Sequence, residues 1–209
     1  MPCNSCNYSN ECNAHRNYTE GSFEKCGLYC FLKTIDEELK THSNEKELIN
    51  TLRNDYLNAW NQNSNSRARG RATGSTFERW IEHQIGEYQG GKVNFNFNNF
   101  NFKFNVEIAI PTTDNPRVIL EVKIYIDIQH TLALGGLLNF TKNKNTKLGL
   151  VTLYKPPEEC IRILNYFKAN ESEKFSYFHI QDGWSKTIKE LKAFCNHKVI
   201  EFRTSSLNL

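Results

Sequence analysis

Residues 93–110 alternate apolar and polar side chains almost without a break. A period of two is typical of a β-strand with one buried face, and a helix cannot bury such a pattern. The apolar positions change parity across Asn98-Asn99. A two-residue turn there would pair Phe97 with Phe100 and start a hairpin, whereas the alternative is a bulge within one long strand. Either arrangement requires a β-sheet.

The chain before this run has the spacing of helices. Apolar residues recur every three or four positions over about 45–60, which predicts a helix. Ser75-x-x-Glu78 has the form of a capping box, so a second helix is predicted to begin there and to end at Gly86 or at Gly90-Gly91. The polar residues 61–74 between the two helices are predicted to form a loop.

Strands and helices alternate after the run. The predicted elements are a strand over 117–126, a helix over 131–141 weakened by two glycines, a strand over 148–154, a helix from 157, a strand over 175–180, a helix over 184–194 and a short strand over 199–202. This order predicts an α/β fold with a mixed central β-sheet flanked by helices.

Cysteine is distributed unevenly, because five of the seven lie within the first thirty residues. Residues 1–32 show little hydrophobic periodicity, so this segment needs a source of order other than a core, and closely spaced thiolates favour zinc. An iron–sulfur cluster is the rival. The predicted zinc ligands are Cys3, Cys6, Cys26 and Cys30, with Cys12 and His15 as alternative ligands.

Charge and hydropathy exclude several classes. No stretch approaches the roughly 18 apolar residues of a membrane helix, so we expect no membrane partner and a cytoplasmic protein. The net charge of +3 does not indicate a strongly basic nucleic-acid binder. Any DNA contact must therefore come from a local cluster, and Arg67, Arg69 and Arg71 form one. Its two interpretations are phosphate contact and a solvated linker.

Two acidic residues interrupt neighbouring apolar strands. Glu121 and Lys123 share one face of their predicted strand, and Glu107 lies on the strand before it. Carboxylates from adjacent strands can bind Mg²⁺ through oxygen and orient a water molecule. The alternative is a solvated face with a cross-strand ion pair. Acid-x-Lys is common by itself, and the chain has a second copy at Glu190-Leu191-Lys192.

The run from Val106 to Lys123 resembles the catalytic hairpin of the PD-(D/E)xK nucleases, in particular of type II restriction endonucleases. The segment 74–78 resembles the first core helix of that family, and 148–154 its strand after the hairpin. The resemblance implies that Glu107, Glu121 and the backbone carbonyl of Val122 bind Mg²⁺. It also implies that Lys123 orients the attacking water or helps to deprotonate it.

Two further acids are open to interpretation. The first acid of the family is usually Asp, so Asp114 is the alternative to Glu107, although its Asp-Asn-Pro setting is ordinary turn chemistry. Glu78 is a candidate for an additional catalytic acid, but the capping box also explains an acid at this position.

The resemblance implies a Mg²⁺-dependent, sequence-specific endonuclease of double-stranded DNA that leaves 5′-phosphate and 3′-hydroxyl ends. We expect a homodimer, because two related sites can cut two antiparallel strands symmetrically. Three units are predicted: a zinc-binding module at 1–32, a helical linker region with the arginine loop at 33–73, and a nuclease core at 74–209. The alternatives are a zinc-finger nucleic-acid-binding regulator without catalysis and a repair-type nuclease with an iron–sulfur cluster.

Overall fold

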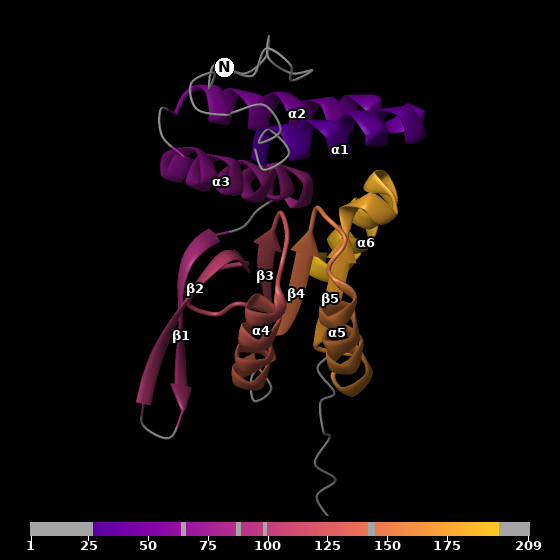
Figure 1. Cartoon of the computed structure of the whole chain (residues 1–209). Coiled ribbons are helices and arrows are strands. Elements are labelled where there is room, and N and C mark those ends of the chain that lie inside the picture. The colour runs from indigo at the N-terminus through magenta and orange to yellow at the C-terminus, as the bar shows by residue number, and fades with distance from the viewer. Residues whose placement is uncertain (1–26, 64–65, 87–88, 98–99, 142–144, 197–209) are drawn as a thin grey trace, which may run out of the picture.

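The computed structural model describes residues 27–63, 66–86, 89–97, 100–141 and 145–196, and its helices lie on both faces and at one end of a sheet (Figure 1). The elements in chain order are α1 Gly27–Thr41, the 3₁₀ helix η2 Ser43–Glu45, α2 Lys46–Asn61, α3 Ser66–Ile85, β1 Gln89–Phe97, β2 Phe100–Ile110, β3 Val118–Lys123, α4 Ile128–Thr141, β4 Lys147–Thr152, α5 Glu158–Asn170, β5 Phe175–His179, the 3₁₀ helix η3 Ile180–Asp182 and α6 Trp184–Asn196.

The sheet has five strands in the order β1-β2-β3-β4-β5. β1, β2 and β3 pair antiparallel, whereas β3, β4 and β5 pair parallel, so the predicted α/β fold with a mixed sheet is confirmed. Phe97 pairs with Phe100 and Phe95 with Phe102, which confirms the hairpin and excludes one long bulged strand.

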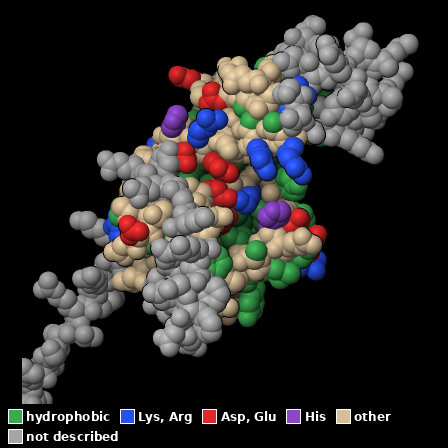
Figure 2. Space-filling model, turned by 90° about the vertical axis from the view of Figure 1, so that its left-hand side faces the viewer, with side chains coloured by type: hydrophobic (Ala, Val, Ile, Leu, Met, Phe, Trp, Pro, Cys, Tyr) green, Lys and Arg blue, Asp and Glu red, His purple; other side chains and the backbone are tan. Residues whose placement is uncertain are grey.

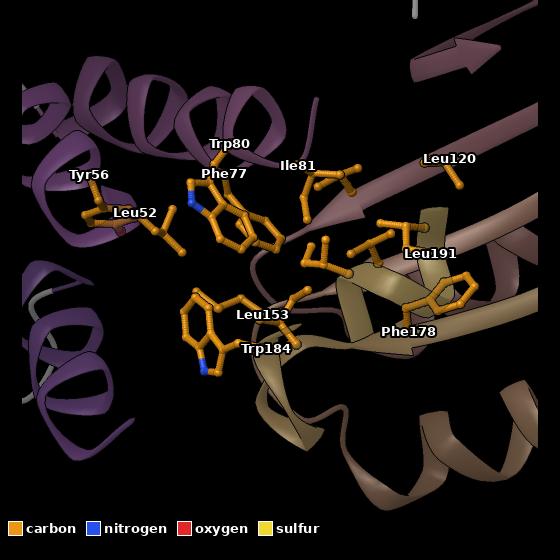
Figure 3. Packing of buried hydrophobic residues seen from close by; sticks show 14 of the residues in the cluster. Leu52, Tyr56, Phe77, Trp80, Ile81, Leu120, Leu153, Phe178, Trp184 and Leu191 are labelled. Atoms are coloured by element: carbon orange, nitrogen blue, oxygen red, sulfur yellow. The ribbon is translucent and has the colours of Figure 1, made fainter. Parts of the chain in front are cut away.

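Two hydrophobic clusters hold the layers together. One joins α1, α2, α3 and α6 to one face of the sheet, and the other joins α4 and α5 to the opposite face. Figure 3 shows the first cluster, in which Trp80 of α3 meets Trp184 of α6 edge to face with ring centroids 5.6 Å apart. The N-terminal helices therefore share a core with the sheet.

The predicted loop over 61–74 is wrong, because α3 already begins at Ser66. Tertiary contacts outweigh the low helix propensity of this segment. Thr73 is buried and its hydroxyl donates to the carbonyl of Arg69 at 2.8 Å, while the Arg69 guanidinium lies over the Trp60 ring of α2. The predicted unit boundary between residues 73 and 74 thus falls inside a helix.

α3 ends at the first of its two predicted stop positions, and Gly90 and Gly91 lie in β1. Gly86 follows Ile85 with a φ of 92°, a left-handed conformation that favours glycine after a helix. α4 is longer than predicted, since it begins at Ile128 and continues through Gly135 and Gly136. β3 is shorter than predicted and ends at Lys123. The predicted strand over 199–202 lies outside the described residues.

Most of the predicted zinc module also lies outside the described residues, including Cys3, Cys6, Cys12, His15 and Cys26. Cys30 is an exposed residue of α1. In the part of the chain that the structure describes, no helix is both long and apolar enough to cross a membrane.

Candidate active site

The candidate site lies at the end of β3, where this strand points toward α3 (Figure 1). Leu120 and Val122 are 0% and 2% exposed and belong to the first cluster. Because neighbouring residues of a strand point to opposite faces, Glu121 and Lys123 share the other face, as predicted. Their side chains stay 15% and 29% exposed.

Glu107 reaches the same place from β2. Ile108 pairs with Leu120 across the antiparallel strands, so the next position puts Glu107 opposite Glu121. Gln89 of β1 pairs with Ala109 of β2, and Gly91 pairs with Val106. Two steps along β1 therefore correspond to three steps along β2, so β2 carries one extra residue. This bulge lies at Glu107 and turns the strand locally.

The bulge also corrects one prediction about β2. The alternation predicts that all even positions share one buried face and that Ala109 lies with Glu107 on the other, solvated face. Instead, Val106 and Ala109 are buried together in the second cluster, and Ile108 and Ile110 belong to the first. Because of the extra residue, even-numbered side chains before and after Glu107 lie on opposite faces of the sheet. The pattern of residue types does not reveal this change.

Lys123 joins the two carboxylates. Its Nζ donates a hydrogen bond to Oε1 of Glu107 and lies 3.4 Å from Oε2 of Glu121. The Glu107 side chain is only 17% exposed, and its Oε2 is buried without a hydrogen-bond partner. The three residues therefore form one partly buried cluster with a carboxylate oxygen to spare.

The electrostatics of the cluster are set by burial and crowding. Burial and then the neighbouring Glu107 raise the pKa of Glu121, and the nearby Lys123 only partly offsets this. Burial acts to lower the pKa of Lys123, but the charges and hydrogen bonds of Glu107 and Glu121 outweigh it and raise that pKa. Lys123 is consequently held as an ammonium group.

Glu78 contributes a further acid from α3. Burial and then the charge of Glu107 raise the pKa of Glu78, and the charge of Lys123 opposes the shift. Because α3 begins at Ser66, Ser75 is not an N-cap residue, and the capping box does not account for Glu78. The structure therefore brings Glu78 into the electrostatic environment of Glu107 and Lys123.

Glu82 was not predicted from the sequence. It follows Glu78 by one helical turn, is 9% exposed and also raises the pKa of Glu78 through its charge. The i,i+4 spacing from Glu78 places it on the same helix face, but the residue types do not reveal its burial. Asp114 lies exposed in the turn between β2 and β3, away from the ion-paired cluster.

The predicted arginines divide into two groups. Arg67 and Arg71 are exposed and, at spacings of four and seven residues, lie on the same face of α3 as Glu78. Arg69 lies on the opposite face, where it donates to the carbonyl of Trp60 at 3.3 Å. Figure 2 shows acidic side chains in the middle of one face of the molecule with basic side chains beside them.

The donor set suits a hard divalent cation. Carboxylate and carbonyl oxygens are the ligands that Mg²⁺ prefers, and the unpartnered Oε2 of Glu107 supplies one such oxygen. Glu121 and the backbone carbonyl of Val122 are the other candidates. Within the described residues, no group of three or more His, Cys, Asp or Glu side chains is placed to hold a metal ion. Any metal site here thus rests on two side-chain carboxylates.

The chain matches no protein-family model, no curated protein and no solved structure.

Proposed function

We propose that this chain is a Mg²⁺-dependent nuclease that hydrolyses phosphodiesters of double-stranded DNA at specific sequences. The observation that carries the proposal is the cluster in which Lys123 joins Glu107 and Glu121, two acids from adjacent strands. A merely solvated strand face does not explain a buried carboxylate oxygen that lacks a partner. The order of helix α3, the β2–β3 hairpin and strand β4 also agrees with the family resemblance of the sequence.

Each residue has a proposed role. Glu107, Glu121 and the Val122 carbonyl would hold Mg²⁺, which neutralises charge on the phosphate and activates water when bound. Lys123 keeps its proton in this setting, so it donates hydrogen bonds to the attacking water or the phosphate instead of acting as a base. The pKa of Glu78 is raised, which makes its carboxylate a stronger acceptor for a proton from water.

The reaction adds the water oxygen to phosphorus and breaks the bond to the 3′-oxygen, which takes up a proton. Its products are a 5′-phosphate and a 3′-hydroxyl. Arg67 and Arg71 extend the site along α3 and are proposed to contact DNA phosphates. We further propose a homodimer, which would cut the two strands at related sites, and a zinc ion bound by Cys3, Cys6, Cys26 and Cys30.

Plasmid cleavage in Mg²⁺ tests the proposal. We expect discrete bands from the wild type and no cleavage by Glu121→Gln or Lys123→Met, while both variants still bind DNA in Ca²⁺. The matched controls are Glu190→Gln and Lys192→Met, because these two residues of the second acid-x-Lys triplet are exposed on α6 and should tolerate the same changes. Intact plasmid with the wild type would favour a binding regulator, and a smear would remove the sequence specificity.

A further inference from the structure

A pocket of about 210 Å³ opens beside the cluster and reaches into the layer between α4 and the sheet. Glu121 and Lys123 line its polar side. Its walls are mainly apolar, and Asn105 and His130 add polar groups; the apolar lining residues are Phe104, Ile126, Ala133, Leu134, Leu137 and Leu150. The proposed chemistry of the cluster does not use this space.

The size and lining of the pocket restrict what it can hold. Drug-sized ligands occupy pockets of roughly 300–1,000 Å³, so this one takes a smaller group. Apolar walls with one aromatic ring and a few polar groups suit a flat heterocycle, whose faces are apolar and whose edge carries donors and acceptors. The adjacent site is proposed to bind a phosphodiester, and the heterocycle joined to a phosphodiester is a nucleobase.

His130 is held in place as a polar group of this pocket. Asp127 precedes α4, and its Oδ1 accepts the backbone N–H of His130 at 2.9 Å and lies 2.7 Å from Nδ1 of the imidazole. These contacts commit Nδ1 to Asp127 and leave Nε2 as the ring nitrogen for a ligand. A fixed imidazole beside an apolar cavity can recognise the edge of a base.

Two exposed apolar side chains are sequence neighbours of residues that line the pocket. Tyr125 is 64% exposed next to Ile126, and Leu132 is 61% exposed next to Ala133. Exposed aromatic and apolar groups beside a cleft are where unstacked bases pack in proteins that bind single strands.

We propose that this pocket binds one unstacked nucleobase of the strand that enters the site. The inference rests on the proposed function and narrows its substrate: the nucleotide beside the cleaved phosphate is flipped out of its duplex or single-stranded. Phe104 and the apolar walls contact the faces of the base, while Asn105 and His130 meet its edge. The pocket thus fixes the register of the strand relative to Glu121 and Lys123.

Binding to single strands in Ca²⁺ tests this assignment without cleavage. The probes are a fluorescein-labelled oligothymidylate dodecamer, the same strand with one central abasic site, and free thymidine monophosphate. Wild-type protein is expected to bind the intact strand about tenfold more tightly than the abasic strand. The variant Ala133→Phe fills the pocket from an exposed position and should bind both strands equally. Asn139→Phe is the matched control: it adds the same ring at an exposed position of α4 that does not line the pocket, so it should keep the preference.

His130→Ala gives a second readout, and it should reduce the preference for the intact strand without affecting the affinity for the abasic one. Far-ultraviolet circular dichroism checks that every variant is folded. Equal binding of both strands by the wild type would overturn the assignment, as would a preference that survives in Ala133→Phe. If free thymidine monophosphate binds as tightly as the intact strand, the proposal that the pocket fixes the register of the strand is overturned. Because no arm requires cleavage, a base preference in a protein that does not cut plasmid would contradict only the proposed nuclease function.

Discussion

The carboxyl group of Glu121 has to meet two opposing conditions. Burial and the neighbouring Glu107 raise its pKa to about 8, whereas a divalent cation binds only its ionised form. At pH values between the ordinary carboxyl pKa and this raised value, Glu121 is protonated in the metal-free site, and a metal that binds there must displace its proton. Affinity for Mg²⁺ or Ca²⁺ is therefore expected to fall as the pH drops below about 8, by up to about tenfold per pH unit.

Calorimetric titration with Ca²⁺ in buffers of different ionisation enthalpy measures this proton release. The wild type should release close to one proton near neutral pH and none well above the raised pKa. Glu121→Gln has no proton to release at this position and serves as the control. An affinity that stays constant across neutral pH in the wild type would contradict a protonated Glu121 in the metal-free site.

The arginines of α3 are expected to differ in role although they are adjacent in sequence. Arg67→Ala and Arg71→Ala should each weaken DNA binding and reduce the slope of log affinity against log salt by about 1, as the loss of one phosphate contact does. Arg69→Ala should leave that slope unchanged and instead lower the free energy of unfolding by about 0.5–1 kcal/mol, because the guanidinium lies over Trp60.

Fluorescence anisotropy of a labelled duplex in Ca²⁺ at several salt concentrations gives the slopes, and urea denaturation gives the stabilities. A salt slope that falls as much in Arg69→Ala as in the other two variants would contradict the separate role of Arg69.

Residue patterns predicted part of the site and missed the rest. Glu107, Glu121 and Lys123 could be found because charged residues in apolar strands stand out, and the strand period places Glu121 beside Lys123. The bulge at Glu107, the buried Glu82 and the pocket at His130 could not, because each depends on how separate elements meet. The extra residue of β2 changes its pairing with β1 but does not change the alternation of apolar and polar residues in the sequence.

Among the elements, α4 contains a glycine pair that weakens the helix prediction and that has one member in a tightly packed helix contact. Two glycines weaken the helix prediction, yet the helix passes through both. A Cβ at Gly135 would lie 2.8 Å from the Phe167 ring of α5, so this glycine permits close packing of the two helices. Nothing lies within 4 Å of a Cβ at Gly136.

The two glycines are therefore expected to respond in opposite directions to the same change. Gly135→Ala should lower the free energy of unfolding by about 1–3 kcal/mol, because the Phe167 ring must shift in a packed interface. Gly136→Ala should raise it by about 0.5–1 kcal/mol through better helix propensity. Urea denaturation of both variants measures the difference, and a change of the same sign in both would contradict the packing role of Gly135.

The element boundaries were predictable where local pattern and packing agree. The β1–β2 hairpin, β4, α5, β5 and α6 have strong periodicity and lie within a few residues of the predicted bounds. The first turns of α3 were not predictable, since their Ser, Arg and Gly residues favour a loop and only contacts with α2 make them helical.

At the scale of the whole molecule, polar contacts connect α1 and η2 with η3 and α6. Oε2 of Glu38 in α1 accepts the indole N–H of Trp184 at 2.9 Å, and its Oε1 accepts the side-chain N–H of Gln181 at 3.0 Å. Oε1 of Glu45 accepts the backbone N–H of Ser185 at 2.8 Å, at the start of α6. The carboxylate there meets the positive end of a helix, and the hydrogen bonds from Ser185 overcome burial to lower the pKa of Glu45.

These contacts and the shared hydrophobic cluster predict that α1–α3 and the sheet unfold as one unit. Glu38→Ala leaves the Trp184 indole N–H without its partner in a buried setting, so it should lower the free energy of unfolding by about 1–3 kcal/mol. Glu37→Ala is the control, because its side chain is exposed on the neighbouring position of α1. Tryptophan fluorescence and far-ultraviolet circular dichroism should report one coincident transition in urea, displaced to lower urea only in Glu38→Ala. Two separate transitions would show instead that the helices before the sheet form their own folding unit, and the cluster joining them to α6 would then contribute little to stability.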